Sequence, residues 1–342
     1  MRSKLPVLFP ILLIACSEPR TASSAAAAKP AAPGAALAAA RPAPAGSGWD
    51  LPDFDDAKQF LSLDSLRWAE VESRVPGDRL ARLQALGITL VRSDSTGARE
   101  PVDTTEGDDY DVYGENARHF HFVDFSGDGV DDVVYDGPWF ERGENGFSAG
   151  EGTRFKLYQV IGGRAVQVLS YFGGVQRIFR GERGHPVSLR AFVPGCCADP
   201  QWSIDYLAPE RAGDTVKYQP YLRVSGREGI VMPARFMERP RTFTVSNDRY
   251  LLRESPAIDP PAPNGEDWYR WEGHGNALAE YASGARGIAL AEQTDATGRV
   301  WWFVRMDGRT GPRDAQFAPL QDDPVRMDRV GWMSSRFLTP DP

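Results

Sequence analysis

Cysteine and histidine are scarce in this chain of 342 residues, which holds three cysteines and four histidines. A protein-bound zinc ion takes three or four ligands, mostly from these two residue types. His119 and His121 lie two residues apart, but His185 and His274 have no supporting motif. We therefore expect a half-exposed strand face at His119 and His121 in preference to a zinc site.

Catalytic fingerprints are also missing. The chain has no H-E-x-x-H, no phosphate-binding loop and no dinucleotide-binding glycine pattern. A cysteine peptidase needs a reactive cysteine with a histidine partner, and no such signature surrounds the candidates Cys196 and Cys197. The sequence therefore predicts a protein that is not an enzyme. A glycosidase built on two carboxylates far apart in the sequence stays open as an alternative.

The N-terminal apolar stretch, Leu5 to Ala15, is too short to cross a bilayer of roughly 30 Å as a helix. It follows a positively charged start, so residues 1–16 are predicted to be a signal peptide. The segment Leu13 to Cys16 resembles the lipobox of bacterial lipoproteins. This resemblance implies cleavage before Cys16, lipidation of Cys16 and a membrane anchor in the bacterial cell envelope, and Ser17 favours the outer membrane. An ordinary secretion signal is the alternative.

Large apolar residues are nearly absent from residues 17–49, which consist mostly of alanine, proline, serine and glycine. Such a segment cannot form a core, so we expect a disordered tether. Its end-to-end distance would be about 30 Å, and it could reach about 100 Å when extended. Without residues 1–16 the chain has 37 basic and 47 acidic residues. This negative balance disfavours nucleic acid as a partner.

Charge is distributed unevenly along the rest of the chain. Residues 97–145 hold fourteen acids and three arginines, whereas residues 223–253 hold seven arginines and three acids. Two solvated faces would explain this pattern. A cation-collecting end and an anion-facing end are the functional alternative.

The folded part is predicted to be mainly β, with a short helical segment at its N-terminal side. Apolar residues at helical spacing occur over residues 54–86, where Asp78 is a suitable helix cap and Gly87 a stop. Residues 50–236 are expected to form one α+β, mostly β domain with antiparallel strands. Strands are predicted at 119–123, 132–135, 153–161, 164–171, 175–180, 186–193, 201–207, 215–224 and 229–236.

The sequence DFSGDGVDD at residues 124–132 is the strongest candidate for a metal site. Its oxygen-bearing residues occupy alternate positions, which a coiled loop can direct to one point, and two glycines permit left-handed turns. Calcium prefers six to eight hard oxygen ligands, but position 12 of an EF-hand loop would here be a tyrosine. The segment instead resembles the calcium loops of FG-GAP/VCBS-type β proteins. That resemblance implies a structural calcium bound by Asp124, Ser126, Asp128, the carbonyl of Val130 and Asp132. A metal-free polar turn is the alternative.

Cys196 and Cys197 are adjacent, and they are the only cysteines besides Cys16. Outside the cytoplasm thiols tend to oxidise, so we expect a disulfide between them or to another molecule. Neighbouring Cα atoms lie about 3.8 Å apart, which is below the usual disulfide range and implies a strained, reducible ring. A redox switch or a ligand-contact turn is the functional interpretation. The simpler interpretation is a disulfide that only stabilises the turn, or two buried thiols.

Residues 237–342 resemble a bacterial SH3 (SH3b) domain. The matching residues, in order along the chain, are Leu252, Arg253, Ser255, Pro256, Gly284, Trp302 to Val304, Gly331, Trp332, Phe337 and Leu338. The resemblance implies a small SH3-like barrel that docks onto peptidoglycan or onto a peptide or protein ligand. An inserted aromatic loop at residues 257–272 contributes Trp268 and Trp271, which we predict to contact that ligand.

Together these features predict a calcium-stabilised binding or adaptor protein of the cell envelope. Its expected partners are peptidoglycan or an envelope peptide, and the membrane through its lipid anchor. SH3b domains also accompany cell-wall hydrolases, so an exported hydrolase is one alternative. A redox-sensing envelope protein that uses Cys196 and Cys197 is another.

Overall fold

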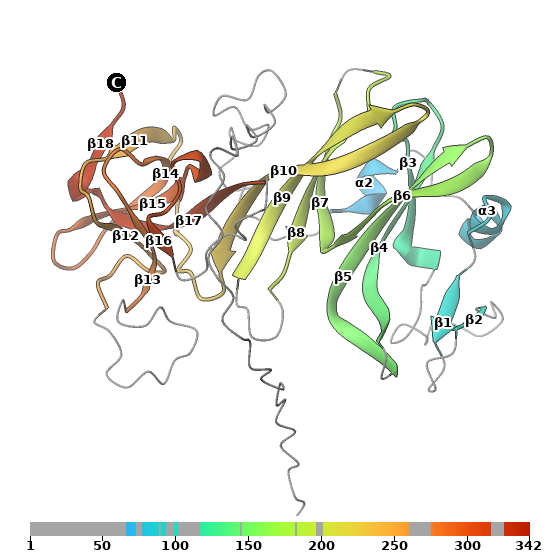
Figure 1. The fold of residues 1–342 in the computed structure, drawn as a ribbon, viewed down its shortest axis with the longest axis horizontal. Coiled ribbons are helices and arrows are strands. Elements are labelled where there is room, and N and C mark those ends of the chain that lie inside the picture. The colour runs from blue at the N-terminus through green and yellow to red at the C-terminus, as the bar shows by residue number, and fades with distance from the viewer. Residues whose placement is uncertain are drawn as a thin grey trace, which may run out of the picture. The chain divides into compact units, whose positions relative to one another are not determined.

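The computed structural model describes most of the chain from residue 66 onward. The described residues are 66–72, 77–88, 90–93, 99–101, 117–143, 146–181, 183–195, 201–259, 275–315 and 325–342. The chain is mainly β, as the sequence predicts (Figure 1).

Two short helices lie within the range predicted to be helical. They are α2 (Trp68–Val71) and α3 (Arg79–Ala85). Residues 54–65 and 73–76 of the predicted range lie outside the described residues. The Asp78 side chain caps α3 by accepting a hydrogen bond from the amide of Ala81 at 2.9 Å. Gly87 ends it with a φ of 81°. Strands β1 (Val91–Ser93) and β2 (Arg99–Pro101) follow as an antiparallel pair.

A four-stranded antiparallel sheet follows in the order β3-β4-β5-β6. Its strands agree with four predicted ones, although two of them extend further than expected: β3 (Phe120–Val123), β4 (Asp132–Gly143), β5 (Gly146–Ile161) and β6 (Arg164–Phe172). The acidic loop 124–131 connects β3 to β4. This sheet therefore fixes both ends of that loop.

The remaining strands form one twelve-stranded sheet, whose main path runs β18-β11-β14-β15-β17-β10-β9-β8-β7. Its first half comprises β7 (Gly174–Phe179), β8 (Ser188–Val193), β9 (Gln201–Ala212) and β10 (Thr215–Arg227). Its second half comprises β11 (Arg241–Val245), β12 (Tyr250–Arg253), β13 (Ala277–Tyr281), β14 (Arg286–Thr294), β15 (Val300–Met306), β16 (Asp314–Ala315), β17 (Arg326–Ser334) and β18 (Leu338–Pro340).

The two halves meet where β10 pairs with β17, and this pairing is parallel. All other pairs in the described sheets are antiparallel. Figure 1 shows the yellow β10 beside the red β17 at this junction. The boundary predicted between residues 236 and 237 therefore separates segments that hydrogen-bond within one sheet.

The strand predicted at 229–236 is wrong. The described backbone there contains turns and extended segments without a strand. Gly229 has a φ of 88° and is the third residue of a turn, in which the amide of Ile230 donates to the carbonyl of Arg227 at 3.2 Å. Pro233 has no N–H to donate to a neighbouring strand. The apolar residues of this segment instead pack on the core, since Ile230 and Phe236 lie against the buried cluster at the junction.

Candidate functional site

The acidic loop is folded around the side chain of Asp124. Its carboxylate accepts hydrogen bonds from the amides of Gly127 at 2.7 Å, Asp128 at 3.2 Å and Gly129 at 2.9 Å. Gly127 and Gly129 have φ values of 73° and 87°, so both adopt the left-handed conformation expected from the sequence. A Cβ atom on Gly127 would lie 2.3 Å from the carbonyl oxygen of His185, which explains why glycine is needed there.

Asp132 holds the other end of the loop and is fully buried. Its two oxygens accept hydrogen bonds from the amides of Ser126 and Val160, both at 2.9 Å. Burial raises the pKa of this carboxyl from 3.8 to about 6, against the opposing effect of these two bonds. The nearby charge of Asp128 raises it further. Asp132 is thus a buried carboxyl group that accepts its hydrogen bonds from neutral backbone amides.

The predicted calcium ligands are brought to one loop but not all to one point. Asp132 accepts from the amide of Ser126, and Asp124 accepts from the amide of Gly127. Asp128 instead accepts from the amide of Val130 at 2.8 Å, and Asp128 and Val130 are both exposed. The Ser126 side chain is fully buried next to the carboxyl of Asp132, whose pKa it lowers. Within the described residues, no group of three histidine, cysteine or acidic side chains is arranged as a metal site. Calcium binding therefore stays a prediction, and the amide bonds show how a metal-free turn could hold the same shape.

The two histidines upstream differ from the expected half-exposed strand face. His119 ends a 3-10 helix at Ala117–His119, and only His121 lies in β3, whose four residues are all buried. The reason is that Trp68 covers this strand: its ring stacks on that of His121 at 4.2 Å with an interplanar angle of 5°. The Nδ1 atom of His121 lies 3.0 Å from Glu72, and burial lowers the pKa of His121 to about 4. His121 is thus an uncharged core residue at neutral pH.

A groove in the second half of the long sheet has a volume of about 260 Å³. Residues from the β12 hairpin, from the turn before β15 and from the 3-10 helix Ser335–Phe337 form its walls. The lining residues are Asn247, Arg249, Tyr250, Leu251, Arg253, Ile258, Arg299, Trp301, Ser334, Arg336 and Phe337. No acidic residue is among them.

Aromatic packing gives the groove its shape. Tyr250 and Phe337 meet edge to face, with ring centroids 5.5 Å apart, and the Tyr250 hydroxyl donates to the carbonyl of Ser334. Trp301 also lines the groove, although it is only 1% exposed, and its indole nitrogen donates to Asp295 at 2.9 Å. Burial raises the pKa of Tyr250, so its hydroxyl stays protonated and keeps donating.

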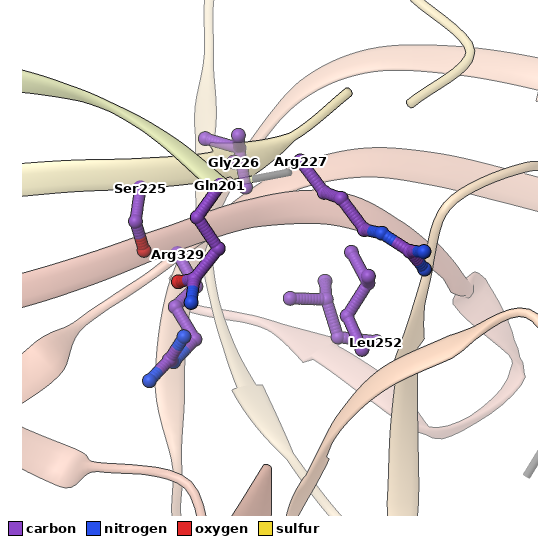
Figure 2. Close-up of a pocket in the computed structure, with 8 residues that line it drawn as sticks. Gln201, Ser225, Gly226, Arg227, Leu252 and Arg329 are labelled. Atoms are coloured by element: carbon purple, nitrogen blue, oxygen red, sulfur yellow. The ribbon is translucent and has the colours of Figure 1, made fainter. Parts of the chain in front are cut away.

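A second, smaller cavity lies at the junction of β10 and β17, and Figure 2 shows its lining residues. Its volume of about 20 Å³ is enough for roughly one water molecule. In Figure 2 the guanidinium groups of Arg227 and Arg329 point to opposite sides of this space. A Cβ atom on Gly226 would lie 2.2 Å from the ring of Trp202, so close packing keeps the cavity small. It is a feature of the core, with no room for an organic ligand.

Several predicted site residues lie outside the described residues. These are Cys16, Cys196, Cys197, Trp268 and Trp271. The groove contains residues that the sequence analysis did not assign to a site, chiefly Tyr250, Arg299 and Arg336. Two signals pointed towards it: the arginine-rich range 223–253, and the SH3-like pattern that includes Arg253 and Phe337.

Comparison with known proteins gives no further guide, because no family model, no curated protein and no solved structure matches this chain. Among the described residues no helix is both long enough and apolar enough to span a membrane.

Proposed function

We propose that this protein is a non-enzymatic envelope protein that binds peptidoglycan or an envelope peptide through the groove lined by Tyr250, Arg299 and Arg336. The observation that carries this proposal is the groove itself, which combines aromatic walls, cationic side chains and a volume of about 260 Å³. Flat apolar rings desolvate well against sugars and extended peptides. The lipid anchor at Cys16 and the tether 17–49 belong to the same proposal, since they would place the groove near the cell wall.

The strand order supports an SH3-like assignment for the second half of the chain. Five antiparallel neighbours run β17-β15-β14-β11-β18, and a 3-10 helix, Ser335–Phe337, separates β17 from β18. The hairpin β12-β13 stands beside them, with Arg253 paired to Trp332 of β17.

Binding fits this groove better than glycoside hydrolysis does. A glycosidase needs two carboxyl groups facing the scissile bond, and no carboxyl group lines the described groove. This composition of the described lining favours an adaptor over the hydrolase alternative.

The test is retention of the chain without residues 1–16 on purified peptidoglycan, with and without calcium. We expect the wild type to be retained and Ile258→Glu to be released, because Ile258 is 55% exposed at the groove. Val166→Glu is the matched control, since Val166 is 43% exposed on β6 in the other sheet. Equal retention of both variants would show that the groove is not the binding surface. Release of sugar or peptide fragments during incubation would instead identify a hydrolase.

A further inference from the structure

We infer that the groove selects an acidic peptide, whose carboxylates would bind to Arg253, Arg299 and Arg336. This inference rests on the proposed function and names the class of ligand for the same groove. It starts from an imbalance of charge, because four arginines and no acid line the groove. Arg249 is already compensated, since it binds both oxygens of Glu280 at 3.1 and 3.2 Å. The other three have no carboxylate within ion-pair distance among the residues that the structure describes.

Arg253 is the most constrained of the three. Its Nη1 atom donates to the side-chain oxygen of Asn276 at 2.7 Å. Asn276 is only 1% exposed and is itself held by donating to Ser255 at 2.7 Å and to the carbonyl of Ala257 at 3.0 Å. A neutral amide therefore fixes the position of the guanidinium without neutralising it. Burial lowers the pKa of Arg253, with Asp259 opposing this effect, so an added carboxylate would stabilise a partly desolvated cation.

Arg299 and Arg336 are exposed, and each lies over an aromatic ring. The guanidinium carbons lie 5.6 Å from the centroid of Trp301 and 5.2 Å from that of Phe337. Contact with a ring face orients the planar guanidinium and leaves its N–H edges available. A guanidinium in this state can donate two parallel hydrogen bonds to one carboxylate.

The distribution of apolar surface favours a peptide over a small anion. Ile258 and the edge-to-face pair Tyr250 and Phe337 lie among the arginines in the same groove. The groove therefore offers cationic and apolar contacts together, and an extended chain with acidic and apolar side chains matches both. A free phosphate or sulfate would leave the apolar contacts unused.

The experiment measures binding of two synthetic peptides to the full chain in detergent. One alternates glutamate with tyrosine, and the other carries glutamine in place of every glutamate. We expect the glutamate peptide to bind more tightly and its affinity to fall with added salt. Arg299→Gln and Arg336→Gln should each weaken it by about threefold to tenfold. Arg164→Gln removes the same charge from an exposed position on β6 and should leave binding unchanged.

Each other outcome would overturn the inference in a distinguishable way. Equal binding of both peptides would leave the groove as a binding site but remove its preference for acids. If neither peptide nor peptidoglycan binds, the inference and the proposed function both fail. Arginine-dependent binding to phosphatidylglycerol vesicles, with no binding of the glutamate peptide, would assign the groove to lipid headgroups instead. Thermal melting of each variant at the wild-type temperature shows that a loss of binding reflects the missing arginine.

Discussion

Replacing Asp132 by asparagine should remove a pH-dependent loss of stability that originates in the acidic loop. In the folded chain this carboxyl is buried and keeps its proton up to a pKa of about 6, whereas its ordinary pKa is 3.8. Between these two values the folded state binds more protons than the unfolded state. The free energy of unfolding therefore falls as the pH rises through this window and stays low above it.

The size of this loss follows from the shift in pKa. A shift of one pKa unit corresponds to about 1.4 kcal/mol. Ionisation of Asp132 should therefore lower the free energy of unfolding by about 3 kcal/mol between about pH 4 and about pH 7. At acidic pH the asparagine variant should have a lower free energy of unfolding than the wild type. Its amide group can accept only one of the two hydrogen bonds from the amides of Ser126 and Val160. That missing bond costs about 1–3 kcal/mol at any pH. As the pH rises to neutrality, the wild type should therefore lose about 3 kcal/mol relative to the variant, which closes or reverses the initial difference in their free energies of unfolding.

Other groups of the described residues titrate in or near the same range, so the comparison must be made between variants. Asp136 also has its pKa raised by burial to about 6 and adds a second loss of the same sign. His121 has its pKa lowered to about 4, so the unfolded state binds more protons and stability rises with pH instead. Asp136→Asn is the matched control, because it changes the pH profile in the same direction at a site outside the acidic loop.

The assay is urea unfolding at several pH values, first with chelator and then with millimolar calcium. With chelator, a gap between wild type and Asp132→Asn that does not change with pH would refute the reasoning about burial. If calcium binds the loop, it should stabilise the wild type at neutral pH by about 2.7 kcal/mol at a hundredfold excess over its Kd. Asp136→Asn should keep this response, and Asp128→Ala should lose it. A wild type that does not respond to calcium would assign the loop to the metal-free polar turn.

Four further predictions test other parts of the molecule. Cys16→Ser should release the protein from membranes on fractionation, and a variant that still sediments would contradict the lipobox. Mass spectrometry of the native protein should show Cys196 and Cys197 without free thiols until reductant is added, so free thiols would exclude a disulfide. Asp328→Asn should lower the free energy of unfolding by about 3–5 kcal/mol, because it removes the negative partner of a fully buried arginine. The isolated segment 237–342 should show no cooperative unfolding transition by circular dichroism, and a sharp transition would confirm an independent domain.

The sequence predicted the fold class and most strands of the first half because these signals are local. Alternation of apolar residues and the glycine turns at residues 162–163 and 173–174 depend on a few neighbours. The segment 229–236 misled the prediction, since its apolar residues cover the core without joining a sheet. The parallel pairing of β10 with β17 could not be predicted, because it joins Leu222 to Arg326 across more than a hundred residues.

The candidate site was predicted unevenly for a similar reason. The acidic loop was recognisable because its residues are consecutive, and its left-handed glycines agree with that pattern. The groove gathers Arg253, Arg299 and Arg336 from three separate segments, so no local motif displays it. The hydrogen bond that positions Arg253 comes from Asn276, and neither residue's sequence context indicates this pairing.

The proposed binding groove lies in the second half of the long sheet, but its geometry should depend on the first half, because the two halves share one core. One buried cluster unites Ile204 and Val224 of the first half with Phe303 and Trp332 of the second, so their apolar surfaces exclude water only together. The indole nitrogen of Trp332 also donates to the carbonyl of Val231 at 2.6 Å, and the parallel pairing satisfies the backbone along one edge of β17. Cutting the chain at 236/237 would expose both the cluster and this edge. The groove belongs to β12, β15 and the residues after β17, so its geometry should be lost with the junction, and binding studies require both halves of the sheet.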